Sequence, residues 1–262
     1  MFEATLDKAQ LLKMIVESIK DLVNDANVEV KETGVSLQAM DSSHVALVSL
    51  NLHSALFSHF RCDRAVPLGL NLSNFAKILK CAGNDDSVTL KALDDGEVLT
   101  IVFESPGQER TSEFELKLMD IDTEHLGIPD EEYAASAKIS AKEFQRIVRD
   151  MSVLGDTCTI ACTKEGINFS VNGDLGKGSI NLRQNAAVDK EDDAVEITLD
   201  EPVELSFALR YLNFFTKATP LAARVHISMS PEVPVVVAYS VGEEEGMGNL
   251  SFYLAPKIED DA

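Results

Sequence analysis

The sequence predicts an α+β protein that consists of a duplicated domain. Three observations indicate this fold class. The chain repeats itself weakly with a period near 133 residues, each repeat contains two helical segments, and the segments between them alternate polar and apolar residues as strands do. The period is far longer than the roughly 20 to 50 residues of solenoid repeats, so it indicates two copies of one domain. The 262 residues leave room for two domains of ordinary size.

Matched residues on two pairs of helical segments carry the repeat. At an offset of 133, Leu11, Lys13, Met14, Ile15 and Ser18 match Phe144, Arg146, Ile147, Val148 and Met151. Near the same offset, Glu32, Gly34 and Val35 match Glu165, Gly166 and Ile167. At an offset of 137, Leu72, Phe75, Ile78 and Lys80 match Leu209, Leu212, Phe215 and Lys217. Both halves therefore have the order amphipathic helix, hairpin strands, short helix and further strands.

Residue spacing predicts helices over 7–22, 72–80, 140–150 and 209–218. The apolar stripe of the first helix consists of Leu11, Leu12, Ile15, Ile19 and Leu22, and its polar side carries Lys13, Glu17 and Lys20. The third helix places Phe144, Ile147, Val148 and Met151 inward and Lys142, Arg146 and Arg149 outward. Each helix is therefore expected to bury one face and to present charge on the other.

The intervening segments predict antiparallel strands. In the first half, 28–31 and 35–38 alternate around a turn at 32–34, and they are followed by 46–52, 98–103 and 111–118. In the last of these, Ser112, Phe114, Leu116 and Leu118 are expected to face one way. The second half contributes the strand segments 158–161, 166–171, 178–182, 203–207, 223–229 and 235–239.

The segment 119–133 breaks this periodicity. It is acidic, and Gly127 and Pro129 disfavour regular structure. We expect a first domain over 1–118, a connecting linker over 119–133, a second domain over 134–256 and an acidic tail over 257–262. Leu126 and Ile128 have two interpretations: they hold the linker to the body, which the residues alone favour, or they form a docking surface. The acidic stretches 189–193 and 259–261 are expected to be solvated.

Charge is sorted by predicted element. The chain has a formal net charge of −21, yet the four helical segments hold 10 basic and 5 acidic residues, whereas the rest of the chain holds 13 basic and 39 acidic residues. A charged helix face is ordinarily only a solvated face. Two features favour a polyanion-binding surface instead: the second and fourth helices carry bases and no acids, and the pattern recurs in both repeats. Few Asn, Gln or aromatic residues accompany these bases, so contacts with phosphates are expected.

The sequence offers little for catalysis or metal binding. Asp41, Ser43 and His44 are adjacent, but a catalytic triad is assembled in space and shows no such local signature. Cys158 and Cys162 share one face of a predicted strand without nearby His or Cys that could complete a zinc site, so buried thiols are expected. The sequence therefore predicts a protein that is not an enzyme and that needs no cofactor or metal. With no apolar run of about 20 residues and no leader-like start, the cytosol or nucleus is expected.

Seven segments spread over the chain resemble the eukaryotic DNA sliding clamp family, proliferating cell nuclear antigen. They are 40–45 (MDSSHV), 61–64 (RCDR), 77–84 (KILKCAGN), 117–120 (KLMD), 126–129 (LGIP), 209–221 (LRYLNFFTKATPL) and 254–259 (LAPKIE). The resemblance implies a duplicated clamp domain with antiparallel sheets outside and two helices per domain lining the inside of a ring of three chains. It also implies a nuclear location and duplex DNA within the ring. The 242–248 loop is longer than is usual in the family and carries no assigned role.

The resemblance also implies functional residues. The DNA-contacting bases would be Lys13, Lys20, Lys77, Lys80, Arg110, Arg146, Arg149, Arg210 and Lys217. Met14 and Val153 stand where relatives often carry a base or His, so one or two contacts are expected to be missing. The subunit contact would pair the strand at 109–117 with the strand at 175–183, using Phe114, Lys117, Leu175, Ile180 and Leu182. Lys164 would be a ubiquitin attachment site.

A partner-docking groove is implied beside the linker, which favours the docking interpretation of Leu126 and Ile128. Its residues would be Met40, His44, Val45, Leu47, Leu126, Gly127, Ile128, Pro234, Tyr253, Ala255 and Pro256. Partners would be the clamp loader, DNA polymerases and other proteins that carry a short motif with a glutamine and aromatic anchors. The predicted function is a DNA polymerase processivity factor that forms a homotrimeric ring and serves replication and repair. Two alternatives stay open: a checkpoint-type clamp subunit of a hetero-oligomeric ring, and a small-molecule hydrolase that uses Ser43 and His44.

Overall fold

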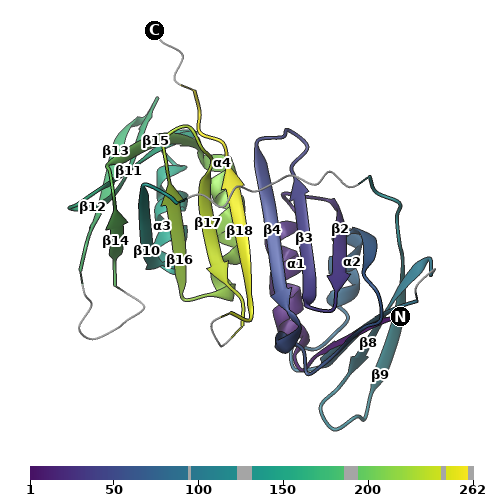
Figure 1. Ribbon diagram of the computed structural model, residues 1–262. Coiled ribbons are helices and arrows are strands. Elements are labelled where there is room, and N and C mark those ends of the chain that lie inside the picture. The colour runs from purple at the N-terminus through teal and green to yellow at the C-terminus, as the bar shows by residue number, and fades with distance from the viewer. Residues whose placement is uncertain (94–95, 123–131, 186–193, 243–245, 259–262) are drawn as a thin grey trace. The chain divides into compact units, whose positions relative to one another are not determined.

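The computed structural model describes residues 1–93, 96–122, 132–185, 194–242 and 246–258. The chain forms two compact units (Figure 1). The first consists mainly of Met1–Ser42 and Val48–Leu126 and takes in Ser240–Leu250. The second consists mainly of Gly127–Tyr239 and takes in Ser43–Leu47 and Ser251–Ala262.

The first unit contains two sheets and two α-helices. In chain order its elements are β1 (Phe2–Leu6), α1 (Ala9–Ile19), β2 (Asp25–Lys31), β3 (Gly34–Met40), β4 (Ala46–His53), the 3-10 helix η1 (Ser54–Leu56), β5 (His59–Cys62), β6 (Val66–Asn71), α2 (Leu72–Leu79), β7 (Ser87–Ala92), β8 (Val98–Glu104) and β9 (Thr111–Lys117). One sheet has the strand order β5-β1-β7-β8-β9, and in the other β4, β3, β2 and β6 are neighbours in that order.

The second unit repeats this arrangement. Its elements are β10 (Ala135–Ser140), α3 (Ala141–Met151), β11 (Thr157–Thr163), β12 (Gly166–Gly173), β13 (Gly176–Arg183), β14 (Glu196–Leu199), β15 (Val203–Ala208), α4 (Leu209–Phe215), the 3-10 helix η3 (Thr216–Leu221), β16 (Arg224–Met229), β17 (Val235–Ser240) and β18 (Gly248–Leu254). One sheet has the order β13-β12-β11-β15, and β14, β10, β16, β17 and β18 are neighbours in that order.

The two units have the same topology, element by element. The order β5-β1-β7-β8-β9 corresponds to β14-β10-β16-β17-β18, and β4-β3-β2-β6 corresponds to β13-β12-β11-β15. Among the described residues the paired strands run antiparallel, as in the hairpin of β2 and β3 and that of β11 and β12. The α+β fold class and the duplication predicted from the sequence are therefore confirmed.

The core of the first unit lies between its helices and both of its sheets. Helix α1 buries Leu12, Ile15, Val16 and Ile19, and α2 buries Leu72, Phe75, Ala76 and Leu79. These side chains meet apolar residues of both sheets, among them Phe2, Val30, Leu37, Leu68, Leu90 and Leu99. Leu11 and Leu22, which the predicted stripe of α1 included, are only half-buried.

In the second unit the predicted inward residues of α3, Phe144, Ile147, Val148 and Met151, are all buried. Figure 1 shows α3 and α4 on one face of strands β10, β16 and β17, and in the first unit it shows α1 and α2 on one face of β4, β3 and β2. In each unit the helices thus cover one side of the sheet and keep their polar side away from it.

Two glycines at equivalent places show how closely the repeats correspond. Gly34 begins β3 with φ +146°, and Gly166 begins β12 with φ +153°. A Cβ on Gly34 would lie 2.0 Å from Leu52 O, and a Cβ on Gly166 would lie 2.1 Å from Leu182 O. Neither position has room for a side chain, which explains why both hairpins keep a glycine there.

The predicted helix at 209–218 differs from the structure at its end. Helix α4 stops at Phe215 and continues as the 3-10 helix η3. Pro220 has no N–H with which to bond to the carbonyl of Thr216, so an α-helix cannot continue there. That carbonyl instead accepts hydrogen bonds from Thr219 Oγ1 at 2.6 Å and from Gln145 Nε2 at 3.2 Å.

The beginning of the segment predicted as a linker is held to the first unit. The Met119 N–H donates to Gly69 O at 2.8 Å, and Asn27 Nδ2 donates to Ile121 O at 2.7 Å. A Cβ on Gly69 would lie 2.0 Å from Met119 O, so the close approach requires glycine. The predictions for Leu126, Gly127 and Ile128, and for the acidic stretches 189–193 and 259–261, fall on residues outside the described ranges.

The two thiols that the sequence predicts on one face of a strand are buried. Cys158 and Cys162 both lie on the buried face of β11, and desolvation raises the pKa of Cys158 to about 12 and also raises that of Cys162. Both thiols are therefore uncharged at neutral pH, as expected for structural cysteines. Within the described residues, His, Cys, Asp and Glu side chains form no group of three that could hold a metal ion.

Arg224 joins three segments of the second unit. Its Nη1 lies 2.7 Å from Glu196 Oε1, and its Nη2 donates to Lys138 O and to Ala194 O, both at 2.9 Å. The side chain is only 11% exposed, and its hydrogen bond lowers the pKa of Glu196. Arg61 offers a comparison, because it makes two hydrogen bonds to Asp63 at 2.8 and 3.0 Å while 55% exposed.

We expect the Arg224→Ala substitution to lower the free energy of unfolding by about 3 kcal/mol, because it removes three hydrogen bonds of a guanidinium group that is only 11% exposed. The matched Arg61→Ala substitution should cost less than about 1 kcal/mol, since exposed ion pairs contribute little. Urea unfolding of both variants at one protein concentration measures the difference. Equal losses would contradict the assigned role of Arg224.

Candidate nucleic-acid interface

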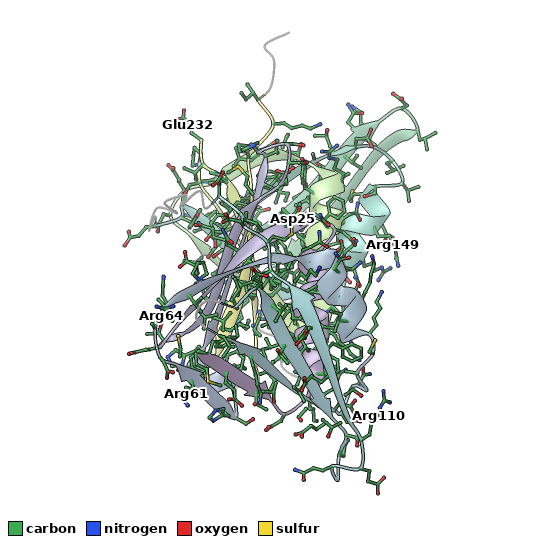
Figure 2. The ribbon with its side chains drawn as sticks, turned by 90° about the vertical axis from the view of Figure 1, so that its right-hand side faces the viewer. Asp25, Arg61, Arg64, Arg110, Arg149 and Glu232 are labelled. Carbon is green, nitrogen blue, oxygen red and sulfur yellow. The ribbon has the colours of Figure 1, made fainter. Side chains whose placement is uncertain are left out.

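The predicted DNA-contacting bases lie on or beside the helices, away from the buried faces, with one exception. In the first unit Lys13 and Lys20 belong to α1 and its C-terminal end, and Lys77 and Lys80 belong to α2 and its C-terminal end. The exception is Arg110, which lies in the turn between β8 and β9. Figure 2 shows Arg110 on the opposite side of the first unit from Arg61 and Arg64.

Lys13 is held by the loop that follows α2. Its Nζ donates to Ala82 O at 2.5 Å and to Asn84 Oδ1 at 3.2 Å. The side chain is half-buried, whereas its repeat equivalent Arg146 is exposed. Lys13 therefore connects α1 to the α2–β7 loop, a role that its position on the helix did not indicate.

Lys20 and Lys80 share one carboxylate. Lys20 Nζ lies 3.3 Å from Glu17 Oε2, and Lys80 Nζ lies 3.4 Å from Glu17 Oε1, so Glu17 links the ends of the two helices. Lys20 is also 3.4 Å from Asp21. Burial opposes the charge on Lys20, but hydrogen bonds to Glu17 and Asp21 outweigh burial and raise its pKa. The Lys20 ammonium group is consequently charged at neutral pH.

Lys77 and Arg110 donate hydrogen bonds to uncharged groups. Lys77 Nζ donates to Asn74 Oδ1 at 3.3 Å, and Arg110 Nε donates to Ser112 Oγ at 3.2 Å. Both bases are exposed. Their positive charges are thus presented to solvent at the surface of the unit.

In the second unit Arg146 and Arg149 lie on the exposed face of α3. Their side chains are 65% and 70% exposed. Both contact Asp150: Arg146 Nε is 3.7 Å from Oδ2, and Arg149 Nη2 is 3.0 Å from Oδ1. Arg146 also approaches Glu143 at 4.0 Å. Figure 2 shows Arg149 projecting outward from its helix.

Aromatic side chains orient the bases of α4 and η3. The Arg210 guanidinium lies 4.6 Å from the centre of the Tyr211 ring, and its Nη2 is 2.8 Å from Tyr211 Oη. Lys217 Nζ lies 5.2 Å from the centre of the Phe214 ring. Such cation–π contacts fix the position of a charge without neutralising it.

This arrangement suits sequence-independent contact with phosphates. Exposed ion pairs are worth at most about 1 kcal/mol, so a phosphate can replace Glu17 or Asp150 as the partner of a base. Exposed Lys and Arg side chains on helices reach backbone phosphates and carry no information about base sequence. Val153, two residues after the end of α3, is an apolar residue that is 68% exposed.

Strands β9 and β13, which carry the predicted subunit contact, each end a sheet. In the described part of the chain β9 pairs with β8, and β13 pairs with β12. Along β9 the residues Ser112, Phe114 and Leu116 are more buried than Glu113, Glu115 and Lys117, as predicted. Along β13 Ile180 and Leu182 alternate with exposed polar residues, and Leu175 just before the strand is 78% exposed.

The predicted docking residues fall into three groups. Met40, half-buried, ends β3 in the first unit. In the second unit the Ala255 N–H donates to Val45 O at 3.1 Å. Of the predicted residues there, Leu47 is buried, Tyr253 and Pro256 are half-buried, and the exposed ones are His44, Val45, Pro234 and Ala255. Leu126, Gly127 and Ile128 lie outside the described residues. We refer to Val45, Tyr253, Ala255 and Pro256 as the apolar patch.

The remaining candidates occupy turns. Ser43 and His44 are exposed before β4, and His44 has φ +56°, while Asp41 is buried. Lys164 is exposed in the two-residue turn between β11 and β12. None of the helices within the described ranges has the length and apolar content needed to cross a lipid bilayer.

The sequence interpretation missed the part played by Glu17 and Asp150. In the sequence they are only acids within basic segments, yet each contacts two bases of its own unit. The repeat contains the signal that could have identified them, because the offset of 133 places Glu17 on Asp150.

Comparison with protein families agrees with the fold and the charged faces. Residues 1–125 match the family model of the proliferating cell nuclear antigen N-terminal domain, and residues 127–257 match that of the C-terminal domain. The two matches cover almost the whole chain, and they divide it as the repeat does. The chain therefore belongs to the proliferating cell nuclear antigen family of DNA sliding clamps.

Proposed function

We propose that this chain is a DNA polymerase processivity factor: three copies close into a ring that encircles duplex DNA and docks replication and repair proteins in the nucleus. The observation that carries the proposal is the set of exposed bases on the helices of both repeats, opposite their buried faces. A surface that recurs with the repeat suits a phosphate backbone, which is itself repetitive.

The benefit of such a ring is topological. A polymerase that is tethered to a ring on DNA stays near the primer end after it lets go, so its effective concentration there remains high and it rebinds quickly. Contacts with phosphates alone allow the ring to slide, because every register along the duplex is equivalent. No catalytic group in the clamp is needed for this function.

Charge complementarity between two strand edges supports the homotrimer. The exposed residues of β9 include Glu113 and Glu115, and those of β13 include Lys177 and Arg183. An antiparallel pairing of β9 from one copy with β13 from the next would satisfy the edge hydrogen bonds of both strands and place opposite charges together. This contact is head-to-tail, so it forms a closed ring when the rotation between copies suits.

The apolar patch supports docking of a short motif with a glutamine and aromatic anchors. Val45 is 37% exposed and is fixed beside Ala255 by a backbone hydrogen bond. Clusters of exposed apolar side chains are common sites for the anchor residues of a partner. Met40, His44, Leu47, Pro234, Leu126, Gly127 and Ile128 complete the proposed docking site, and Lys164 is the proposed site of ubiquitin attachment.

The Lys20→Glu, Lys77→Glu, Arg149→Glu and Arg210→Glu substitutions combined should reduce polymerase stimulation by at least about tenfold at physiological salt. Each lost phosphate contact also lowers the slope of log affinity against log salt by about 0.9. Primer extension on a singly primed circle, with loader and polymerase, measures stimulation, and anisotropy of a short duplex measures the slope.

The matched control reverses the charge of four exposed bases on or beside strands by changing each to Glu: Lys31, Arg61, Arg64 and Lys138. It changes the net charge equally, so it should leave stimulation within about twofold of wild type if charge acts locally. Equal loss in both variants, or normal stimulation by the helix variant, would refute the helix faces as the DNA-contacting surface.

The second prediction concerns assembly. The Glu113→Lys and Glu115→Lys pair should prevent ring formation at micromolar concentration, because it places like charges at the proposed contact. Lys177→Glu with Arg183→Glu should act in the same way, and the variant with all four changes should assemble again. Native mass spectrometry measures these states, and three identical chains are expected for wild type. A persistent monomer, or a ring that requires a different chain as in checkpoint clamps, would refute the homotrimer.

The third prediction concerns docking. Val45→Glu should weaken binding of a fluorescent peptide with the glutamine and aromatic anchors by more than about tenfold, because it buries a charge against an apolar ligand. Val153→Glu is the matched control, since Val153 is also an exposed valine of the second unit, and it should bind the peptide normally. Equal affinity of the Val45→Glu variant and wild type would show that the peptide docks elsewhere.

A further inference from the structure

We infer that Glu17 and Asp150 limit how tightly the helix faces hold DNA, and that they do so by accepting the basic side chains that a phosphate releases as the duplex moves. The inference rests on the proposed encirclement of DNA. It adds two acidic residues to the proposed sliding surface.

Glu17 lies between two bases of the first unit. Its two oxygens lie 3.3 Å from Lys20 Nζ and 3.4 Å from Lys80 Nζ. Oε1 is covered from solvent and makes no hydrogen bond among the described residues, so its nearby partner is the charge of Lys80. The Glu17 side chain as a whole is 43% exposed, so its ion pairs contribute little to stability. Its effect is therefore mainly on the two bases.

Asp150 repeats this arrangement in the second unit. It lies 3.7 Å from Arg146 and 3.0 Å from Arg149, and it stands at the position that the offset of 133 assigns to Glu17. The partners of Glu17 are reached across two helices, whereas those of Asp150 lie on its own helix. Two different local geometries thus place one carboxylate between two bases at the same point of the repeat.

Two other bases contact uncharged groups. Lys77 contacts the amide of Asn74, and Arg210 contacts Tyr211. The bases therefore fall into two classes: those whose charge is presented directly to solvent, and those that must leave a carboxylate before they contact a phosphate. The second class can exchange between two anionic partners at little cost, since exposed ion pairs are weak.

This exchange has a consequence for sliding. Each step along the duplex breaks contacts with one set of phosphates before the next set forms. A base that returns to Glu17 or Asp150 during the step keeps an anionic partner, so the step costs less than it would for an isolated base. Removing the carboxylate should both strengthen the equilibrium contact and slow the motion.

The test compares wild type with Glu17→Gln and Asp150→Asn. Glu29→Gln is the matched control, because Glu29 pairs with Lys31 at 2.7 Å on β2 and its change also removes one negative charge and releases one lysine. Affinity for a short linear duplex should rise roughly fivefold at 0.15 M salt for each base newly engaged, and the salt slope should steepen by about 0.9 per base. The diffusion coefficient on long DNA, measured by single-molecule tracking, should fall several-fold.

A double-mutant cycle makes the assignment specific. Lys80→Gln should cost little affinity in wild type and several-fold more in the Glu17→Gln background, because only there does Lys80 contact phosphates without competition. Lys77→Gln should cost the same in both backgrounds.

The outcomes separate this inference from the proposed function. If wild type forms a ring that slides on DNA while Glu17→Gln behaves like Glu29→Gln, the inference fails and the clamp assignment stands. If wild type neither assembles nor binds duplex, the proposed function fails. Loss of the ring mass in Asp150→Asn would overturn the assignment of Asp150, and Glu17→Gln would then decide the case of Glu17.

Discussion

Burial of one apolar face on each helix fixes the position of most basic side chains in the proposed DNA-contacting surface. A buried Leu, Ile or Phe contributes about 2 kcal/mol, whereas an exposed ion pair contributes less than about 1 kcal/mol. The rotation of a helix about its axis is therefore set by its apolar residues. In α3 Phe144 and Ile147 are buried, so Arg146 and Arg149 must face away from the sheets. The charged surface is thus a consequence of core packing.

This dependence explains which features could be predicted from the sequence. The duplication, the exposed bases of α3 and the buried thiols of β11 follow from periodicity, which is a local property of the chain. The strand order does not, because β1 joins β7 across 80 residues and no local pattern encodes that pairing. The premature end of α4 was readable in principle, since Pro220 cannot continue an α-helix.

Long-range contacts also account for the side chains that were interpreted incompletely. Lys13 reads as an exposed base because it matches Arg146 in the repeat, yet the loop at Ala82 and Asn84 binds its ammonium group. Glu17 reads as an ordinary acid on a polar face, although Lys80, 63 residues away, lies 3.4 Å from it. In both cases the residue type and helical face were correct, and the missing element was a partner from another segment. Such partners are visible only when the fold is known.

The sorting of charge resolves an apparent conflict between a net charge of −21 and contact with a polyanion. At physiological salt electrostatic effects between exposed groups decay over about 8 Å, while packed layers of secondary structure are separated by about 10 Å. The acidic residues outside the helices therefore cancel little of the charge on the helix faces. What matters for a phosphate at such a face is the local balance of bases and carboxylates. In the first unit the carboxylates of Glu17 and Asp21 stand beside the two bases Lys20 and Lys80, so negative and positive charges are equal in number there. Single carboxylates at this face therefore have more influence than the total charge of the chain.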